Sequence, residues 1–146
     1  MARYPAIGET FELTLNGDEH PPLDMVTGYG YPEVQRWQYI GTTVTGIETK
    51  KFKLIQVGKC DNLTQILHKI REQEGEIPPG QWLEALKKVY GPTGDDKRLV
   101  GIADASWKSQ RGHTRFPYIY SNGIPKFAWS DHGFGEIWCW LVFSDE

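Results

Sequence analysis

The chain has 146 residues, of which 39% are hydrophobic and 24% are charged, and its formal net charge is −3. This composition excludes an intrinsically disordered chain, and the length is typical of a single domain, here spanning residues 1–146, that buries its own core. The charges are evenly spread, and no basic excess of the kind that binds a phosphate backbone is present, so we expect no general nucleic-acid binding.

The first 58 residues are expected to form loops and strands. Pro, Gly and Asn residues are frequent in residues 1–33, and most of this region is predicted to be a long ordered loop. Within it, Thr10–Leu15 alternates apolar and polar residues, which is typical of a half-buried strand. Residues 34–58 indicate further strands, with a hairpin connection at 46–51.

Two amphipathic helices follow, at about 62–74 and 79–90. Apolar residues recur in the first at the spacing of one helix face, and Asn62 with Gln65 three residues later forms a helix-start signal. The second begins near Pro79, which suits a first turn, and Gly91 follows its last apolar residue. We expect both helices to pack on one face of the sheet.

The remaining residues read as strands. Two alternating segments flank Asn122-Gly123, which is the strongest short-range hairpin signal. The last segment, Glu136–Phe143, is apolar on both faces and is therefore expected to be a central strand buried on both sides. Because strands, two helices and strands follow one another, we predict an α+β fold with a mainly antiparallel twisted sheet.

Features of secretion, membranes and metal sites are missing from the sequence. The N-terminus has no apolar signal segment, and no apolar run approaches the length of a membrane span. Cys60 and Cys139 are far apart in sequence, and the Cys and His residues lack ligand spacing. We therefore predict a soluble cytoplasmic protein with free thiols that needs no metal or cofactor and does not contact membranes.

One group of residues could perform acid–base chemistry. Asp104 follows a short apolar segment, where site residues often lie, and Asp131 and His132 occupy a Gly-containing turn further on. His113 lies in the intervening polar segment. A histidine beside carboxylates can act as a general base, so these four residues are the candidate catalytic set. Turn chemistry alone also explains Asp131 and His132.

A second group could bind a ligand. The chain has six Trp, seven Tyr and six Phe, many rings for a core of this size, and we expect some of them to line a cleft or a partner surface. Arg111 and Arg115, with Lys108 and His113, could also hold a phosphate or carboxylate. The predicted ligand-binding residues are Trp37, Trp107, Arg111, Arg115, Tyr118, Tyr120 and Trp129.

Two hypotheses for function follow. The first is a binding or interaction protein with an aromatic-lined cleft or surface, whose partner is a small molecule or a protein. The alternative is a small hydrolase-like enzyme that uses Asp104, His113, Asp131 and His132, and it requires several of these groups within hydrogen-bond reach of each other. Homo-oligomerisation through the same aromatics is a third, weaker hypothesis. The sequence identifies neither the ligand nor a reaction.

Overall fold

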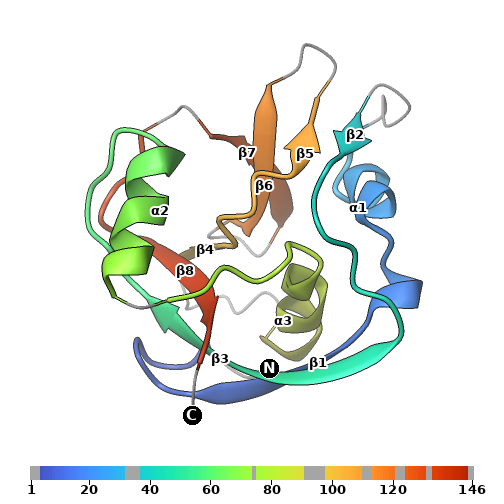
Figure 1. The fold of residues 1–146 in the computed structure, drawn as a ribbon, viewed down its shortest axis with the longest axis horizontal. Coiled ribbons are helices and arrows are strands. Elements are labelled where there is room, and N and C mark those ends of the chain that lie inside the picture. Colours follow the sequence, from blue (N-terminus) through green and yellow to red (C-terminus); the bar gives the residue numbers. More distant parts are fainter. Residues whose placement is uncertain are drawn as a thin grey trace.

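The computed structural model describes residues 4–31, 37–73, 75–90, 98–109, 113–120, 124–130 and 133–144, and shows an α+β fold (Figure 1). The helical elements are η1 (Gly17–Glu19, a 3-10 helix), α1 (Pro22–Gly28), α2 (Leu63–Glu72) and α3 (Trp82–Tyr90). The strands are β1 (Phe11–Asn16), β2 (Gln38–Tyr39), β3 (Ile47–Ile55), β4 (Leu99–Gly101), β5 (Trp107–Lys108), β6 (Thr114–Ile119), β7 (Pro125–Trp129) and β8 (Trp138–Phe143). Among the helices described, none is both long and apolar enough to cross a membrane.

The strands form one mixed sheet. Its order is β1-β3-β8-β4-β6-β5-β2, and β7 pairs with β6 outside this path. The described strand pairs are antiparallel except for β4 and β8, which run parallel. The expectation of a mainly antiparallel sheet is therefore confirmed in part, because one described pair is parallel. The parallel pair arises because the chain passes through β5, β6 and β7 before β8 returns beside β4, and parallel neighbours need such a long connection.

Strand β8 lies between β3 and β4 and is buried on both sides, as its sequence predicts. Cys139 and Leu141 belong to one apolar cluster, and Trp140 and Val142 belong to the other. Successive side chains of a strand point to opposite faces, so the two clusters cover the two faces of the sheet. Each face of β8 therefore needs a covering layer.

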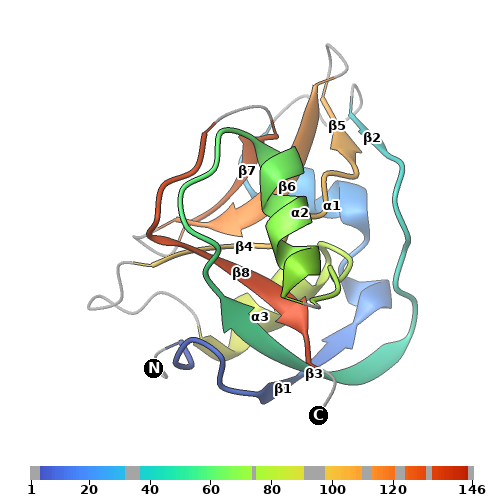
Figure 2. The same cartoon turned by 60° about the vertical axis from the view of Figure 1, so that its left-hand side comes forward.

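The two long helices supply one layer each and do not share a face, so the prediction that both pack on one face is wrong. In α2, Leu63, Ile66 and Ile70 join the cluster of Trp140. In α3, the apolar side chains join the cluster of Leu141. Figure 2 shows α2 in front of β8 and α3 behind it. The doubly apolar β8 explains this arrangement, because two helices on one side would leave the other side exposed.

Local signals in the sequence are confirmed at several element ends. The Asn62 side chain accepts a hydrogen bond from the Gln65 N–H at 3.0 Å and caps α2. Strands β6 and β7 pair with Ile119 opposite Pro125, as expected for a hairpin, although its turn at 121–123 lies outside the described residues.

In the N-terminal third, strands that are distant in the sequence pair with each other, and the structure differs from the predicted hairpin and loop. Residues 46–51 form no hairpin, because β3 runs through most of them and pairs antiparallel with β1, placing Ile47 opposite Asn16. This register buries Leu13 and Leu15 under α3. The predicted N-terminal loop also contains α1, in which Pro22 occupies the first turn and Met25 and Val26 are buried.

Candidate functional site

The β6–β7 pair carries aromatic side chains on both of its faces. Arg115 is paired with Trp129, and Pro117 with Phe127, so these side chains share one face. The alternate residues share the other face, where the small Ala128 is paired with Phe116. The strand pair therefore presents two different aromatic surfaces.

On the first surface, aromatic rings surround Arg115. Its guanidinium carbon lies 5.3 Å from the ring centre of Trp37, 5.1 Å from that of Trp129 and 6.0 Å from that of Tyr31. Burial lowers the pKa of Arg115, while Tyr31 acts in the opposite direction. The His113 ring stacks on Trp129 with 5.0 Å between ring centres and 7° between planes. The side chains of Arg115 and His113 are thus both engaged with rings of the protein itself.

A hollow of about 260 Å³ lies beside Ala128 and is lined by side chains from both surfaces. Tyr118 and Trp138 are in contact, with 4.9 Å between ring centres, and Phe134 meets Trp138 edge-on at 5.1 Å. The small methyl group of Ala128 leaves space beside these rings, which accounts for the hollow. The residues lining it are Arg115, Tyr118, Phe127, Ala128, Trp129, Gly133, Phe134 and Trp138.

The rings around this hollow are held from below by the core. Phe116 and Trp140 are fully buried and contact Phe134 and Trp138. Burial is the main cause of the raised pKa of Tyr118, so its hydroxyl is protonated and can donate a hydrogen bond at neutral pH. The hollow is therefore bordered by aromatic rings, preformed and equipped with a donor.

The predicted ligand-binding residues fall into three groups. Arg115, Tyr118 and Trp129 line the hollow, and Tyr120 lies near it, 6.4 Å from Tyr118 by ring centres and 41% exposed. Trp37 and Trp107 are buried in the core and are not among the described residues lining this hollow, so their role in binding stays a prediction. Arg111 lies outside the described residues.

Asp104, the first candidate catalytic residue, accepts hydrogen bonds from neighbouring residues at both of its carboxylate oxygens. One carboxylate oxygen accepts the Gly80 N–H at 2.8 Å, and the other accepts the Ser106 hydroxyl. Burial raises the pKa of Asp104, although both hydrogen bonds oppose this effect. The charge of Asp104 adds to burial in raising the pKa of Tyr39. Asp104 and Ser106 line a second hollow, of about 390 Å³.

The other candidate catalytic residues do not complete an acid–base site. His113 lies against Trp129, and no hydrogen bond or ion pair between described residues joins it to Asp104. Asp131 and His132 lie outside the described residues, so their role stays a prediction. Within the described ranges, no group of three or more His, Cys, Asp or Glu side chains is arranged to hold a metal ion.

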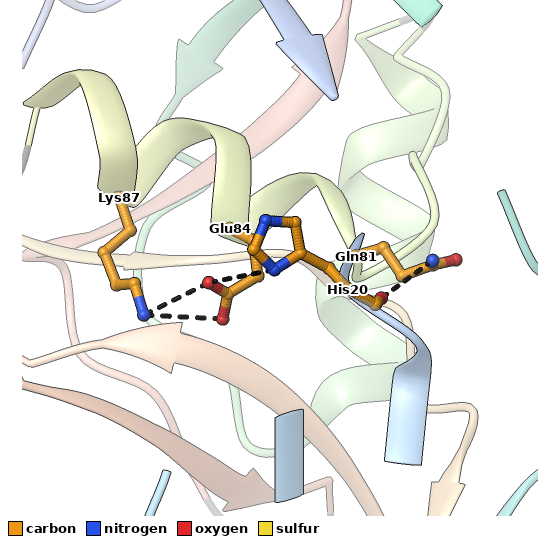
Figure 3. Close-up of polar contacts among 4 residues, drawn as sticks. All are labelled: His20, Gln81, Glu84 and Lys87. Atoms are coloured by element: carbon orange, nitrogen blue, oxygen red, sulfur yellow. Dashed lines mark hydrogen bonds and ion pairs between the residues drawn. The ribbon is translucent and has the colours of Figure 1, made fainter. Parts of the chain in front are cut away.

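A polar cluster that was not predicted from the sequence lies between η1, α1 and α3 (Figure 3). In this cluster, Glu84 is only 8% exposed, and the ammonium of Lys87 and the ring of His20 lie against its carboxylate. The Glu84–Lys87 spacing of three residues on a helix was the available signal. His20 could not be placed from sequence, because its proximity to α3 depends on the tertiary fold.

Comparisons with protein-family models, with curated proteins and with solved structures found no match to this chain. Its function must therefore be argued from the chemistry of its sites.

Proposed function

We propose that this protein binds a small aromatic ligand in the hollow beside Ala128. The observation that carries the proposal is a preformed hollow bordered by the supported rings of Tyr118, Phe134 and Trp138, which contact one another. Flat ligands bind well against such rings, because stacking adds to the burial of apolar surface. The volume of about 260 Å³ lies just below the usual ~300–1,000 Å³ of ligand pockets, which favours a ligand of one or two rings.

The polar groups of the lining side chains favour a ligand with a hydrogen-bond acceptor. Arg115 and the indole N–H groups of Trp129 and Trp138 only donate, and the protonated Tyr118 hydroxyl can donate as well. None of the described residues that line the hollow is acidic. A ring bearing a carboxylate or carbonyl therefore suits the hollow better than a ring bearing an amine.

The proposal is tested with 2-naphthoate and 2-naphthylmethylamine as probes, using isothermal titration calorimetry. We expect the carboxylate to bind more tightly than the amine. Ala128→Leu should weaken naphthoate binding at least about tenfold, because the larger side chain fills the hollow. Ala6→Leu, at an exposed position, is the matched control and should leave the affinity unchanged. Equal affinity of the Ala128→Leu variant and the parent would contradict the proposed site.

The alternative, an acid–base enzyme, retains one supporting observation. A buried carboxylate with a raised pKa, such as Asp104, is typical of functional sites, and it borders a hollow. Hydrolysis of p-nitrophenyl esters by the parent, abolished in Asp104→Asn, would favour this function. The hydrogen bonds to Gly80 and Ser106 also give Asp104 a structural role, because they fix the turn before α3.

A further inference from the structure

A buried carboxylate forms part of the wall of a separate hollow of about 210 Å³ between η1, α1 and α3. The carboxylate belongs to Glu84, whose side chain is 8% exposed. Burying a charged group is costly unless it is paired, so the contacts of Glu84 indicate what this hollow accommodates. Figure 3 shows the contacts that the Lys87 ammonium and the His20 ring make with the two carboxylate oxygens of Glu84.

The principal partner of Glu84 is an ammonium group of the same chain. Nζ of Lys87 lies 3.1 Å from one carboxylate oxygen of Glu84 and 3.5 Å from the other. The same atom lies 5.3 Å from the ring centre of Tyr29, so it also faces an aromatic ring. A carboxylate and an aromatic face are the two groups that most often bind organic ammonium ions. Lys87 is 33% exposed, so its side chain has an open route to solvent.

The hydroxyl of Tyr29 is a second polar group buried at this hollow. It forms no hydrogen bond of standard geometry with the described residues. Burial raises the pKa of Tyr29 well above its usual value, and both the charge of nearby Glu84 and a hydrogen-bonding interaction with its carboxylate add to the effect. A buried hydroxyl without a hydrogen bond of standard geometry is uncommon in native proteins. An occupant of the hollow can supply such a bond.

The rim of the hollow is acidic. Glu19 and Asp24 line it together with Glu84, and Lys87 is the matching ammonium within this lining. Among the described lining residues, three carboxylates thus face one ammonium, and His20, with Nδ1 3.8 Å from Glu84, adds a positive charge only when protonated. The excess of negative charge favours a ligand with more than one positive group.

We propose that this hollow binds an aliphatic diamine. One ammonium of the ligand replaces that of Lys87 on Glu84 and against the Tyr29 ring, and the other lies at the rim near Glu19 and Asp24. Lys87 is then an internal competitor that moves toward solvent when the ligand enters. This site is separate from the aromatic hollow, and neither proposal depends on the other.

The test uses 1,5-diaminopentane in calorimetry and in thermal unfolding at constant ionic strength. Lys87→Met should bind the diamine about tenfold more tightly than the parent, because the competing ammonium is gone. The diamine should also raise the unfolding temperature of this variant more than that of the parent. Lys88→Met, which removes an exposed charge one position along the same helix, is the matched control and should behave like the parent.

Two further measurements separate a ligand site from an ordinary ion pair. In the Lys87→Met background, Glu84→Gln should abolish diamine binding while near-UV circular dichroism shows a folded protein, since the buried carboxylate that binds the first ammonium is gone. Neither 1,5-pentanediol nor Mg²⁺ at the same concentration should reproduce the effect. The proposal is overturned if Lys87→Met binds no more tightly than Lys88→Met, or if pentanediol or Mg²⁺ acts like the diamine.

Discussion

Gln81 should be one of the residues on which folding depends most strongly. Its side chain is fully buried in the turn before α3. Its amide nitrogen donates to the carbonyl of His20 at 3.0 Å and to that of Val44 at 3.2 Å, and its oxygen accepts the Val44 N–H at 2.7 Å. One side chain thus joins the start of α3 to two segments that are far away in sequence. The bond to His20 also places that residue beside Glu84 (Figure 3).

The substitution Gln81→Leu keeps approximately the same volume and removes all three hydrogen bonds. The Val44 N–H and carbonyl and the His20 carbonyl would lose these bonds in a site that leaves little room for water. Each unsatisfied buried group costs about 1–3 kcal/mol, and the leucine itself recovers part of this through apolar burial. The expected loss is about 3–5 kcal/mol, a large share of the stability of an ordinary domain.

Urea unfolding followed by circular dichroism measures this loss. The midpoint should fall while the slope of free energy against urea concentration stays constant, since the unfolded surface is unchanged. Gln73→Leu is the control, because Gln73 is exposed, and it should change the free energy of unfolding by no more than about 0.5 kcal/mol. A loss below about 1 kcal/mol for Gln81→Leu would refute the argument that these three bonds are needed.

Three other predictions concern stability. Trp140→Ala should cost about 3–5 kcal/mol in urea unfolding, because the ring is fully buried in the central strand; a midpoint equal to that of the parent would argue against this. Gly80→Ala should lower the unfolding temperature, since the new methyl carbon would lie 2.4 Å from the Trp107 ring, and unchanged stability would show that the ring can move away. Burial holds the pKa of the Asp104 carboxyl above its ordinary 3.8, so the folded protein binds a proton at this group more tightly than the unfolded chain does. The folded protein therefore loses stability as the pH rises above 3.8. Asp104→Asn stays neutral, so its free energy of unfolding should gain on that of the parent as the pH rises above about 4, and parallel pH profiles would count against this cause.

The sequence predicts those parts of the fold that depend on local pattern. Asn62 caps α2, the alternation of residues 10–15 gives β1, and the doubly apolar β8 is central. The face on which each helix packs was not predictable in this way, because helix periodicity shows that an apolar stripe is buried but not against what. The pairing of β1 with β3 likewise depends on a contact across about 30 residues, so the local turn signal at 46–51 was misleading.

The candidate sites were likewise predictable only in part, because their arrangement depends on tertiary contacts as well as on local sequence. The aromatic excess pointed to Tyr118 and Trp129, which line the hollow, but also to Trp107, which is in the core. Composition cannot separate these cases, because a Trp suits both environments. The hollow itself depends on the small side chain of Ala128, a residue type that attracts no attention in a sequence. The Glu84 cluster needs α1 and η1 folded against α3.

The central claim, that the hollow beside Ala128 binds a small aromatic ligand, is tested most directly by methyl NMR. The protein would carry ¹³C-labelled alanine methyl groups and be titrated with 2-naphthoate. We predict a large, saturable shift of the Ala128 methyl signal, caused by the ring current of the bound ligand, and little change at Ala85 on the opposite face of the sheet. An Ala128 signal that does not move at saturating ligand, or that moves no more than Ala85, would contradict the account.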